Sequence, residues 1–85
     1  MFDKMKQIKQ LKDFESSLKK EEITKEKDGI KVAVNLRMDI LDIKLNPELD
    51  TETQEKKLLE CLTSALNDAK MQMARKAQSM GGFGL

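Results

Sequence analysis

The side chains of this chain that could carry out chemistry are almost all lysines and carboxylates. Histidine, the residue that most often serves as a general base or metal ligand near neutral pH, is missing from the 85 residues. The one cysteine, Cys61, has no histidine or second cysteine to activate it, so we expect it to fill a small space on the apolar flank of a helix. Three of the four glycines follow residue 80, and none forms a phosphate-binding loop after a strand. These residue types argue against an enzyme, and they predict no metal, no cofactor and no small-molecule substrate.

The basic residues are more informative because they gather toward the two ends of the chain. Sixteen basic and fifteen acidic side chains leave a net charge of +1, so the strongly basic balance of many nucleic-acid-binding proteins is absent. Residues 1–20 nevertheless hold six lysines against three acids, and residues 21–50 hold five basic against eight acidic side chains. After Asp68, the charged side chains are Lys70, Arg75 and Lys76. This pattern fits either lysine-rich outer helix faces that keep a protein soluble or a surface that contacts a polyanion.

Two segments have the periodicity of amphipathic helices. The first covers residues 2–21, and the second begins near Thr51, which forms a capping-box pattern with Gln54. Gly81-Gly82 would end the second helix. The expected apolar positions are Ile8, Leu11, Phe14 and Leu18 in the first helix and Leu58, Leu62, Leu66, Ala69, Met73, Ala77 and Met80 in the second.

Between the helices, alternation of apolar and polar residues predicts three antiparallel strands. Asp28-Gly29 is a strong turn signal between the first two, because glycine tolerates positive φ. In residues 30–36 and in residues 41–45, every second residue is a large apolar one, so these side chains share one face of their strand. The expected cross-strand pairs are Ile23 with Val34, Leu36 with Leu41, Val34 with Ile43, and Val32 with Leu45.

These elements predict one α+β domain over residues 1–85: a helix, a three-stranded antiparallel sheet and a long C-terminal helix. The last helix would be about 45 Å long at ~1.5 Å per residue, whereas strands of about seven residues span only ~23 Å. It must therefore overhang the sheet, at the edge from which the first helix also projects. Two helical arms result, in which Met5, Ile8 and Leu11 could face Met73, Ala77 and Met80.

The length of the chain and its targeting signals bear on its oligomeric state and its location in the cell. A chain of 85 residues buries a modest core, and association with a second copy is a common remedy. No apolar run approaches the ~18–20 residues of a membrane span, and the N-terminus lacks the apolar region of a secretory signal. We therefore expect a cytoplasmic protein that does not interact with membranes.

A longer motif lies in the last predicted helix. Residues 58–76, LLECLTSALNDAKMQMARK, contain a leucine-acid-x-leucine run followed by Ala-x-Asn-Asp-Ala. This stretch resembles the signature of the YbaB/EbfC family, the bacterial nucleoid-associated DNA-binding proteins. The likeness continues in GIKVAV, in LNPEL, in the Lys/Gln-rich first helix and in the tail MGGFGL. In the turn between the second and third strands, where the family usually has a glycine, this chain has Arg37-Met38-Asp39.

The resemblance implies a tweezer-like homodimer with joined sheets and projecting helical arms, which binds double-stranded DNA in the bacterial nucleoid. Phosphate contacts from arm residues would dominate binding, and we expect Asn67 and Asp68 to hydrogen-bond to the hairpin or to the partner subunit. An alternative is a dimeric adaptor that holds a protein partner with methionine-rich helix tips. The candidate DNA contacts are Lys4, Lys6, Lys9, Lys12, Lys70, Arg75 and Lys76, and the candidate structural or dimer residues are Asn67, Asp68, Met73 and Met80.

Overall fold

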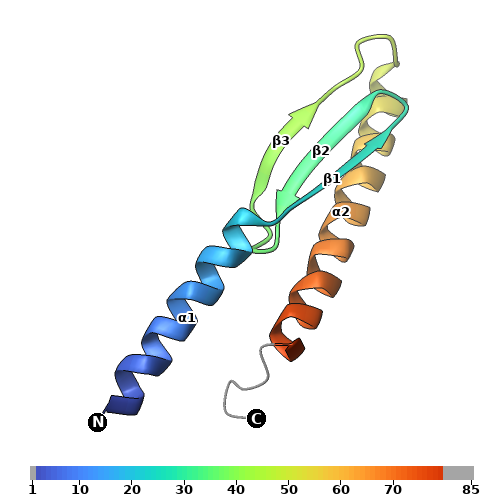
Figure 1. Cartoon of the computed structure of the whole chain (residues 1–85). Helices are drawn as coiled ribbons and strands as arrows, with labels where there is room; N and C mark the ends of the chain where they lie inside the picture. The colour runs from blue at the N-terminus through green and yellow to red at the C-terminus, as the bar shows by residue number, and fades with distance from the viewer. Residues whose placement is uncertain (1, 80–85) are drawn as a thin grey trace.

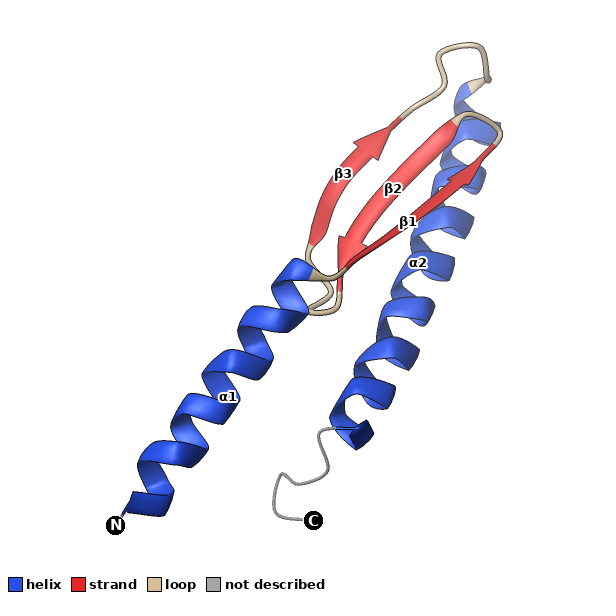
Figure 2. Cartoon of the chain, in the orientation of Figure 1, coloured by secondary structure: helices blue, strands red, loops and turns tan. Residues whose placement is uncertain are grey.

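The computed structural model describes residues 2–79, with side chains from Lys6 onward. The chain forms α1 (Phe2–Lys20), β1 (Glu22–Lys27), β2 (Ile30–Asn35), β3 (Ile40–Lys44) and α2 (Thr51–Ser79). The strands form one antiparallel sheet in the order β1-β2-β3, and α2 lies across one face of it (Figure 1; Figure 2). The predicted α+β fold of helix, three strands and long C-terminal helix is confirmed.

The β1–β2 hairpin follows its sequence closely. Asp28 and Gly29 have φ values of 52° and 80°, the two positive values that a type I′ turn requires. Ile23 lies opposite Val34, as predicted. The amide of Asn46, in the loop after β3, donates from Nδ2 to the carbonyl oxygen of Asp28 at 2.9 Å. This hydrogen bond ties the tip of the hairpin to the loop that leads into α2.

The predicted pairing between β2 and β3 is wrong by two residues at Val32 and by three residues at Val34. Val32 lies opposite Ile43, and Val34 lies opposite Ile40, with a bulge at Leu41. The cause is the turn, which Asn35 closes: its Oδ1 accepts from the backbone N–H groups of Arg37 and Asp39 at 2.9 and 3.0 Å. The shift of two residues at Val32 keeps Ile43 on the predicted face, and the bulge adds the third residue of the error at Val34.

Met38 provides the left-handed residue of this turn, with φ of 68°. Hairpin loops of three residues normally end on a residue in this conformation, and glycine is the residue that adopts it without steric cost. A methionine can occupy the position here because Asn35 makes three hydrogen bonds within the turn, the third from its Nδ2 to Asp39 at 3.0 Å. The hairpin therefore forms without a glycine in its turn.

The core lies between α2 and the sheet. Ile30, Val32 and Val34 are fully buried and pack against the side of α2 that carries Cys61, Ala65 and Ala69. The predicted apolar face of α2 is thus rotated, because small residues line its centre and let the helix approach the sheet. Leu58, Leu62, Leu66 and Met73 lie beside that centre and are half-buried.

The N-terminus of α2 also differs from its prediction. The backbone N–H of Gln54 bonds to the carbonyl oxygen of Asp50 at 2.9 Å, so Asp50, and not Thr51, occupies the capping position. Gln54 Oε1 is buried and has no hydrogen-bond partner within the described residues. The expected capping box between Thr51 and Gln54 is therefore wrong.

The molecule is elongated, with extents of 60 × 18 × 14 Å, because both helices extend beyond the sheet at the same end of its strands (Figure 1). α1 is anchored at its C-terminal end, where Leu18 is buried and its carbonyl oxygen accepts from the N–H of Leu36 at 3.0 Å. Ile8 and Leu11 are 54% and 51% exposed. The two arms therefore do not form the expected apolar stalk within one chain over this stretch. The side chains of Met5 and Met80, also expected there, lie outside the described residues.

Candidate nucleic-acid interface

The basic residues of α1 lie on the side of the helix opposite its apolar stripe. Phe14 and Leu18 belong to that stripe; Leu18 is part of the core, and Phe14 packs against it. At about 100° per residue, Lys6, Lys9 and Lys12 project to the other side. All three are exposed, and none makes an ion pair with a described residue. The outer surface of α1 therefore carries three free cations together with the exposed Asp13, while the side chain of Lys4 lies outside the described residues.

The basic residues of the α2 arm, residues 70–79, point in different directions. Lys70 and Arg75 are exposed and make no ion pair within the described part of the chain. Lys76 instead lies 3.3 Å from the carboxylate of Glu21, the residue between α1 and β1. Two of the three predicted α2 cations are thus free to meet a ligand, and the third has an acidic partner.

The lysines of β1 are neutralised by acids on α2. Lys25 Nζ lies 2.6 Å from Asp68, and Lys27 Nζ lies 2.9 Å from Glu60. The hydrogen bond from Lys27 and its charge lower the pKa of Glu60 below its usual 4.5, and the same contact raises the pKa of Lys27 above 10.5. This charged seam connects α2 with the sheet, and it leaves little free positive charge at that surface.

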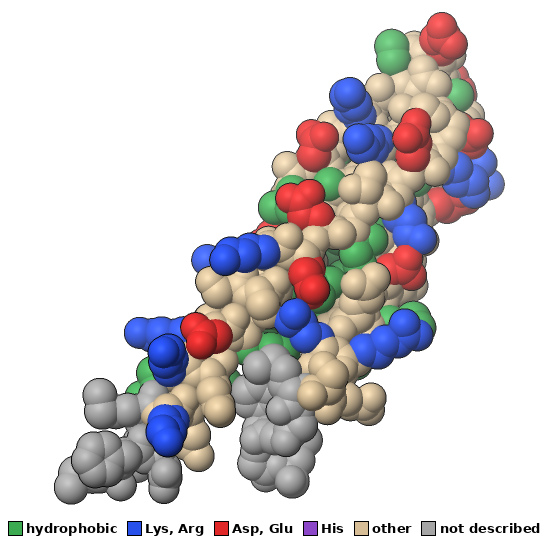
Figure 3. Space-filling view, in the orientation of Figure 1, with side chains coloured by type: hydrophobic (Ala, Val, Ile, Leu, Met, Phe, Trp, Pro, Cys, Tyr) green, Lys and Arg blue, Asp and Glu red, His purple; other side chains and the backbone are tan. Residues whose placement is uncertain are grey.

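The sheet face turned away from α2 is not basic either. In the register of the three strands it carries Glu22, Glu26 and Asp42 against Lys31 and Lys44. In the view of Figure 3, Lys and Arg predominate over the arms, whereas both signs are mixed over the end that holds the sheet. Lys31, Arg37, Lys44 and Lys56 also make no ion pair among the described residues, so the sheet end differs from the arms in its larger share of acids and not in a lack of free cations.

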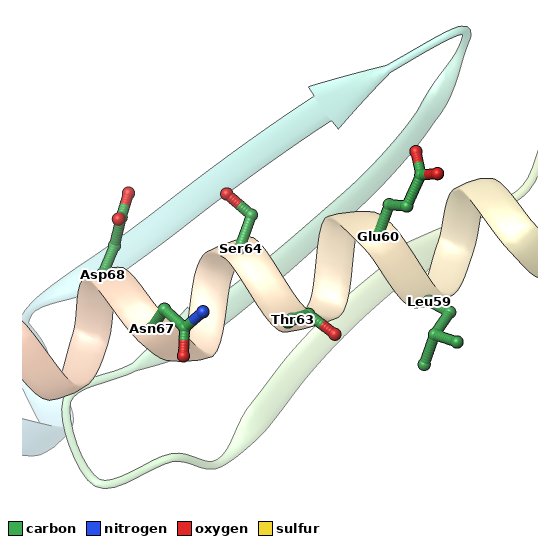
Figure 4. Close-up of a pocket in the computed structure, with 6 residues that line it drawn as sticks. All are labelled: Leu59, Glu60, Thr63, Ser64, Asn67 and Asp68. Carbon is green, nitrogen blue, oxygen red and sulfur yellow. The ribbon is translucent and has the colours of Figure 1, made fainter.

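Asn67 and Asp68, the polar pair in the middle of α2, have different surroundings. Figure 4 shows Glu60, Ser64 and Asp68 pointing toward β1, while Leu59, Thr63 and Asn67 point away from it. Asp68 reaches Lys25 of the hairpin, whereas Asn67 is exposed and its side chain makes no hydrogen bond within the described residues. The six side chains line an open hollow on the surface of α2.

An apolar surface that the sequence did not localise runs along β3. α2 packs against β1 and β2 and leaves β3 largely uncovered, since one helix about 10 Å wide spans only two strands spaced ~4.8 Å apart. On α2 itself, Leu62 and Leu66 lie on the side turned away from the acids that meet β1, and Leu59 continues this side while 67% exposed. The exposed apolar residues of β3 and its end are Ile40, Leu41, Ile43 and Leu45.

Three further features of the described residues concern metal binding, membrane spanning and the cysteine. No three His, Cys, Asp or Glu side chains in residues 6–79 are placed to hold a metal ion. Neither of the two described helices is long and apolar enough to cross a membrane. Cys61 is buried, in agreement with its expected packing role.

Comparison with known proteins agrees with the charge distribution. A search of curated proteins and a search of solved structures each found no match. The family model described as the YbaB/EbfC DNA-binding family, however, matches residues 1–83, nearly the whole chain. That family is a DNA-binding, nucleoid-associated family and not an enzyme family. The chain belongs to the YbaB/EbfC DNA-binding family.

Proposed function

We propose that this chain binds double-stranded DNA of the bacterial nucleoid mainly through phosphate contacts made by its arms. The observation that supports this is the local charge balance: the arm cations are exposed and mostly unpaired, whereas the sheet end mixes its cations with acids and pairs Lys25 and Lys27 with Asp68 and Glu60. Lysine side chains meet phosphates as point charges and carry little sequence information. The proposed contacts are Lys4, Lys6, Lys9, Lys12, Lys70 and Arg75, with Lys76 available when it leaves Glu21.

The amphipathic character of α1 indicates which side meets DNA. Its apolar stripe faces the core at Phe14 and Leu18, so its lysines point away from α2 of the same chain. The duplex would therefore lie against the outer surface of α1, not in the space between α1 and α2 of one chain.

We further propose that the binding unit is a homodimer formed through β3 and the neighbouring side of α2. The two edges of the sheet differ: β1 carries five charged or polar residues in EITKEK, whereas β3 exposes Ile40, Leu41 and Ile43. Charged side chains protect an edge strand from pairing, and an apolar edge invites it. A second copy, related by a two-fold axis, would present the same apolar surface, as an isologous contact requires.

The apolar side chains that a single chain leaves exposed agree with a homodimer. A single chain leaves Ile8 and Leu11 of α1 about half exposed, and it covers neither β3 nor Leu59. One chain of 85 residues gains limited stability from so thin a core. Within the dimer, exposed Asn67 would reach the partner subunit, while Asp68 keeps its contact with Lys25.

The test is the salt dependence of binding to duplex DNA. If a dimer contacts about four to eight phosphates, log affinity should fall with log salt with a slope of roughly −4 to −7. Arg75→Ala should weaken binding about equally on two duplexes of unrelated sequence and flatten the slope by about one for each chain that makes the contact.

Lys44→Ala provides the matched control, because Lys44 is also an exposed cation but lies on the mixed-charge face of the sheet. The proposal fails if Lys44→Ala reduces the slope and Arg75→Ala does not. Failure to bind duplex DNA, together with salt-insensitive binding of a protein, would instead support the alternative of a dimeric adaptor whose methionine-rich helix tips dock a protein partner.

A further inference from the structure

The ion pair between Glu21 and Lys76 joins the base of α1 to the last turn of the α2 arm. Glu21 is the single residue between α1 and β1, and Lys76 lies in the last turn of α2. Their Oε2 and Nζ atoms are 3.3 Å apart. No other ion pair among the described residues connects the end of α1 with the arm of α2. The pair also removes one cation from an arm that otherwise presents Lys70 and Arg75.

The exposure of the two partners suits a contact that can be exchanged. The Glu21 side chain is 49% exposed and that of Lys76 is 25% exposed, so solvent and salt weaken their attraction. Duplex DNA carries about one negative charge per ~1.7 Å of its axis, which is a far denser source of anions than one carboxylate. Lys76 points about 100° away from Arg75 around the helix, so its ammonium group can meet these phosphates only after it leaves Glu21 and turns outward.

We propose that Glu21 competes with DNA phosphate for Lys76 and thereby limits the DNA affinity of the α2 arm. Lys76 is occupied by Glu21 in the free chain, and Glu21 retains it in most complexes with DNA, so Lys76 reaches a phosphate in only a minority of them. The inference rests on the proposed DNA-binding function of the arms. It assigns Glu21, an acidic residue outside the basic surface, as the residue that determines how many phosphates the arm engages.

The first experiment compares Glu21→Gln with Glu22→Gln in the full chain. The two substitutions remove the same charge at adjacent positions, but Glu22 makes no ion pair with Lys76. Glu21→Gln should raise duplex affinity about two- to fivefold at low salt and steepen the salt slope by about 0.9 for each bound chain. Adding Lys76→Gln to Glu21→Gln should return both values to those of the wild type, and Lys76→Gln alone should leave the slope almost unchanged.

A second measurement needs no DNA. Amine labelling followed by mass spectrometry should modify Lys76 several-fold more slowly than exposed Lys70 in the wild-type chain. Glu21→Gln should remove this difference, and Glu22→Gln should preserve it.

The outcomes separate the two proposals. Failure of the wild-type chain to bind duplex DNA refutes the proposed function. Binding with equal affinities and slopes for Glu21→Gln and Glu22→Gln refutes the competition alone, as does equal labelling of Lys70 and Lys76 in the wild type. A slope that Lys76→Gln flattens as much as Arg75→Ala would show that Lys76 contacts phosphate without hindrance, and it would overturn the inference as well.

Discussion

Replacing Leu59 by alanine should separate dimer formation from folding. Leu59 is 67% exposed in the single chain, and alanine is the better helix former, so the fold of the subunit should tolerate the change. In the proposed dimer, by contrast, the partner covers this side chain. The substitution removes roughly three carbon groups, worth ~0.8 kcal/mol each when fully buried, or ~2.4 kcal/mol in total.

About two thirds of that burial would come from the partner, which gives ~1.6 kcal/mol for each copy. Two-fold symmetry places Leu59 of both copies in the interface, so the free energy of dimer formation should weaken by about 3 kcal/mol. The dissociation constant of the dimer should then rise on the order of 100-fold. Sedimentation or light scattering over a range of concentrations would measure this, with the wild type expected at twice 9.7 kDa.

Met71→Ala is the matched control for that experiment. Met71 is 56% exposed on the same helix, but it lies away from the side that continues Leu62 and Leu66. Its loss should change the dissociation constant only slightly. The reasoning would be refuted if Leu59→Ala left the dissociation constant unchanged, or if Met71→Ala weakened the dimer as much.

Two further predictions concern stability. Gly29→Ala should lower the free energy of unfolding by about 2–3 kcal/mol in denaturant titration, because alanine is strained at φ 80° and its Cβ would stand 2.7 Å from Asn46 Nδ2; an unchanged midpoint would contradict this. Glu60 has a lowered pKa in the folded chain, so its contribution is present above the unfolded value near 4.5 and is lost as pH falls through the folded pKa. Thermal melts below pH 4.5 should therefore show a smaller loss of stability for Glu60→Gln than for the wild type, and parallel pH curves would count against the Lys27–Glu60 contact.

Local patterns were sufficient to predict the elements and their order. Helical periodicity, strand alternation and the Asp28-Gly29 turn each depend on residues close in sequence, and the first hairpin followed directly with Ile23 opposite Val34. The Asn-Asp-Ala motif in α2 correctly indicated the family. The burial of Cys61 was also predictable, since a small apolar residue on the flank of a helix suits close packing.

The register of β3 depended on a side chain whose role the local pattern does not reveal. Asn35 fixes the second turn through three hydrogen bonds, with Met38 in a conformation that usually selects glycine. A period of two residues specifies the face of a strand but not which residue lies opposite which. The two-residue part of the pairing error follows from that degeneracy, and the bulge at Leu41 adds the third residue at Val34.

The chemistry of the arms was decided partly by sequence and partly by the fold. The sequence alone placed lysines at both ends of the chain, because their positions on the helices follow from spacing. It could not show which cations have acidic partners, since Lys25 meets Asp68 and Lys76 meets Glu21 across more than forty residues of chain. Nor could it show that α2 covers two strands and leaves β3 exposed, because that depends on the width of a helix against the spacing of strands. Ion pairing and coverage are properties of distances in space, and only the tertiary structure determines them.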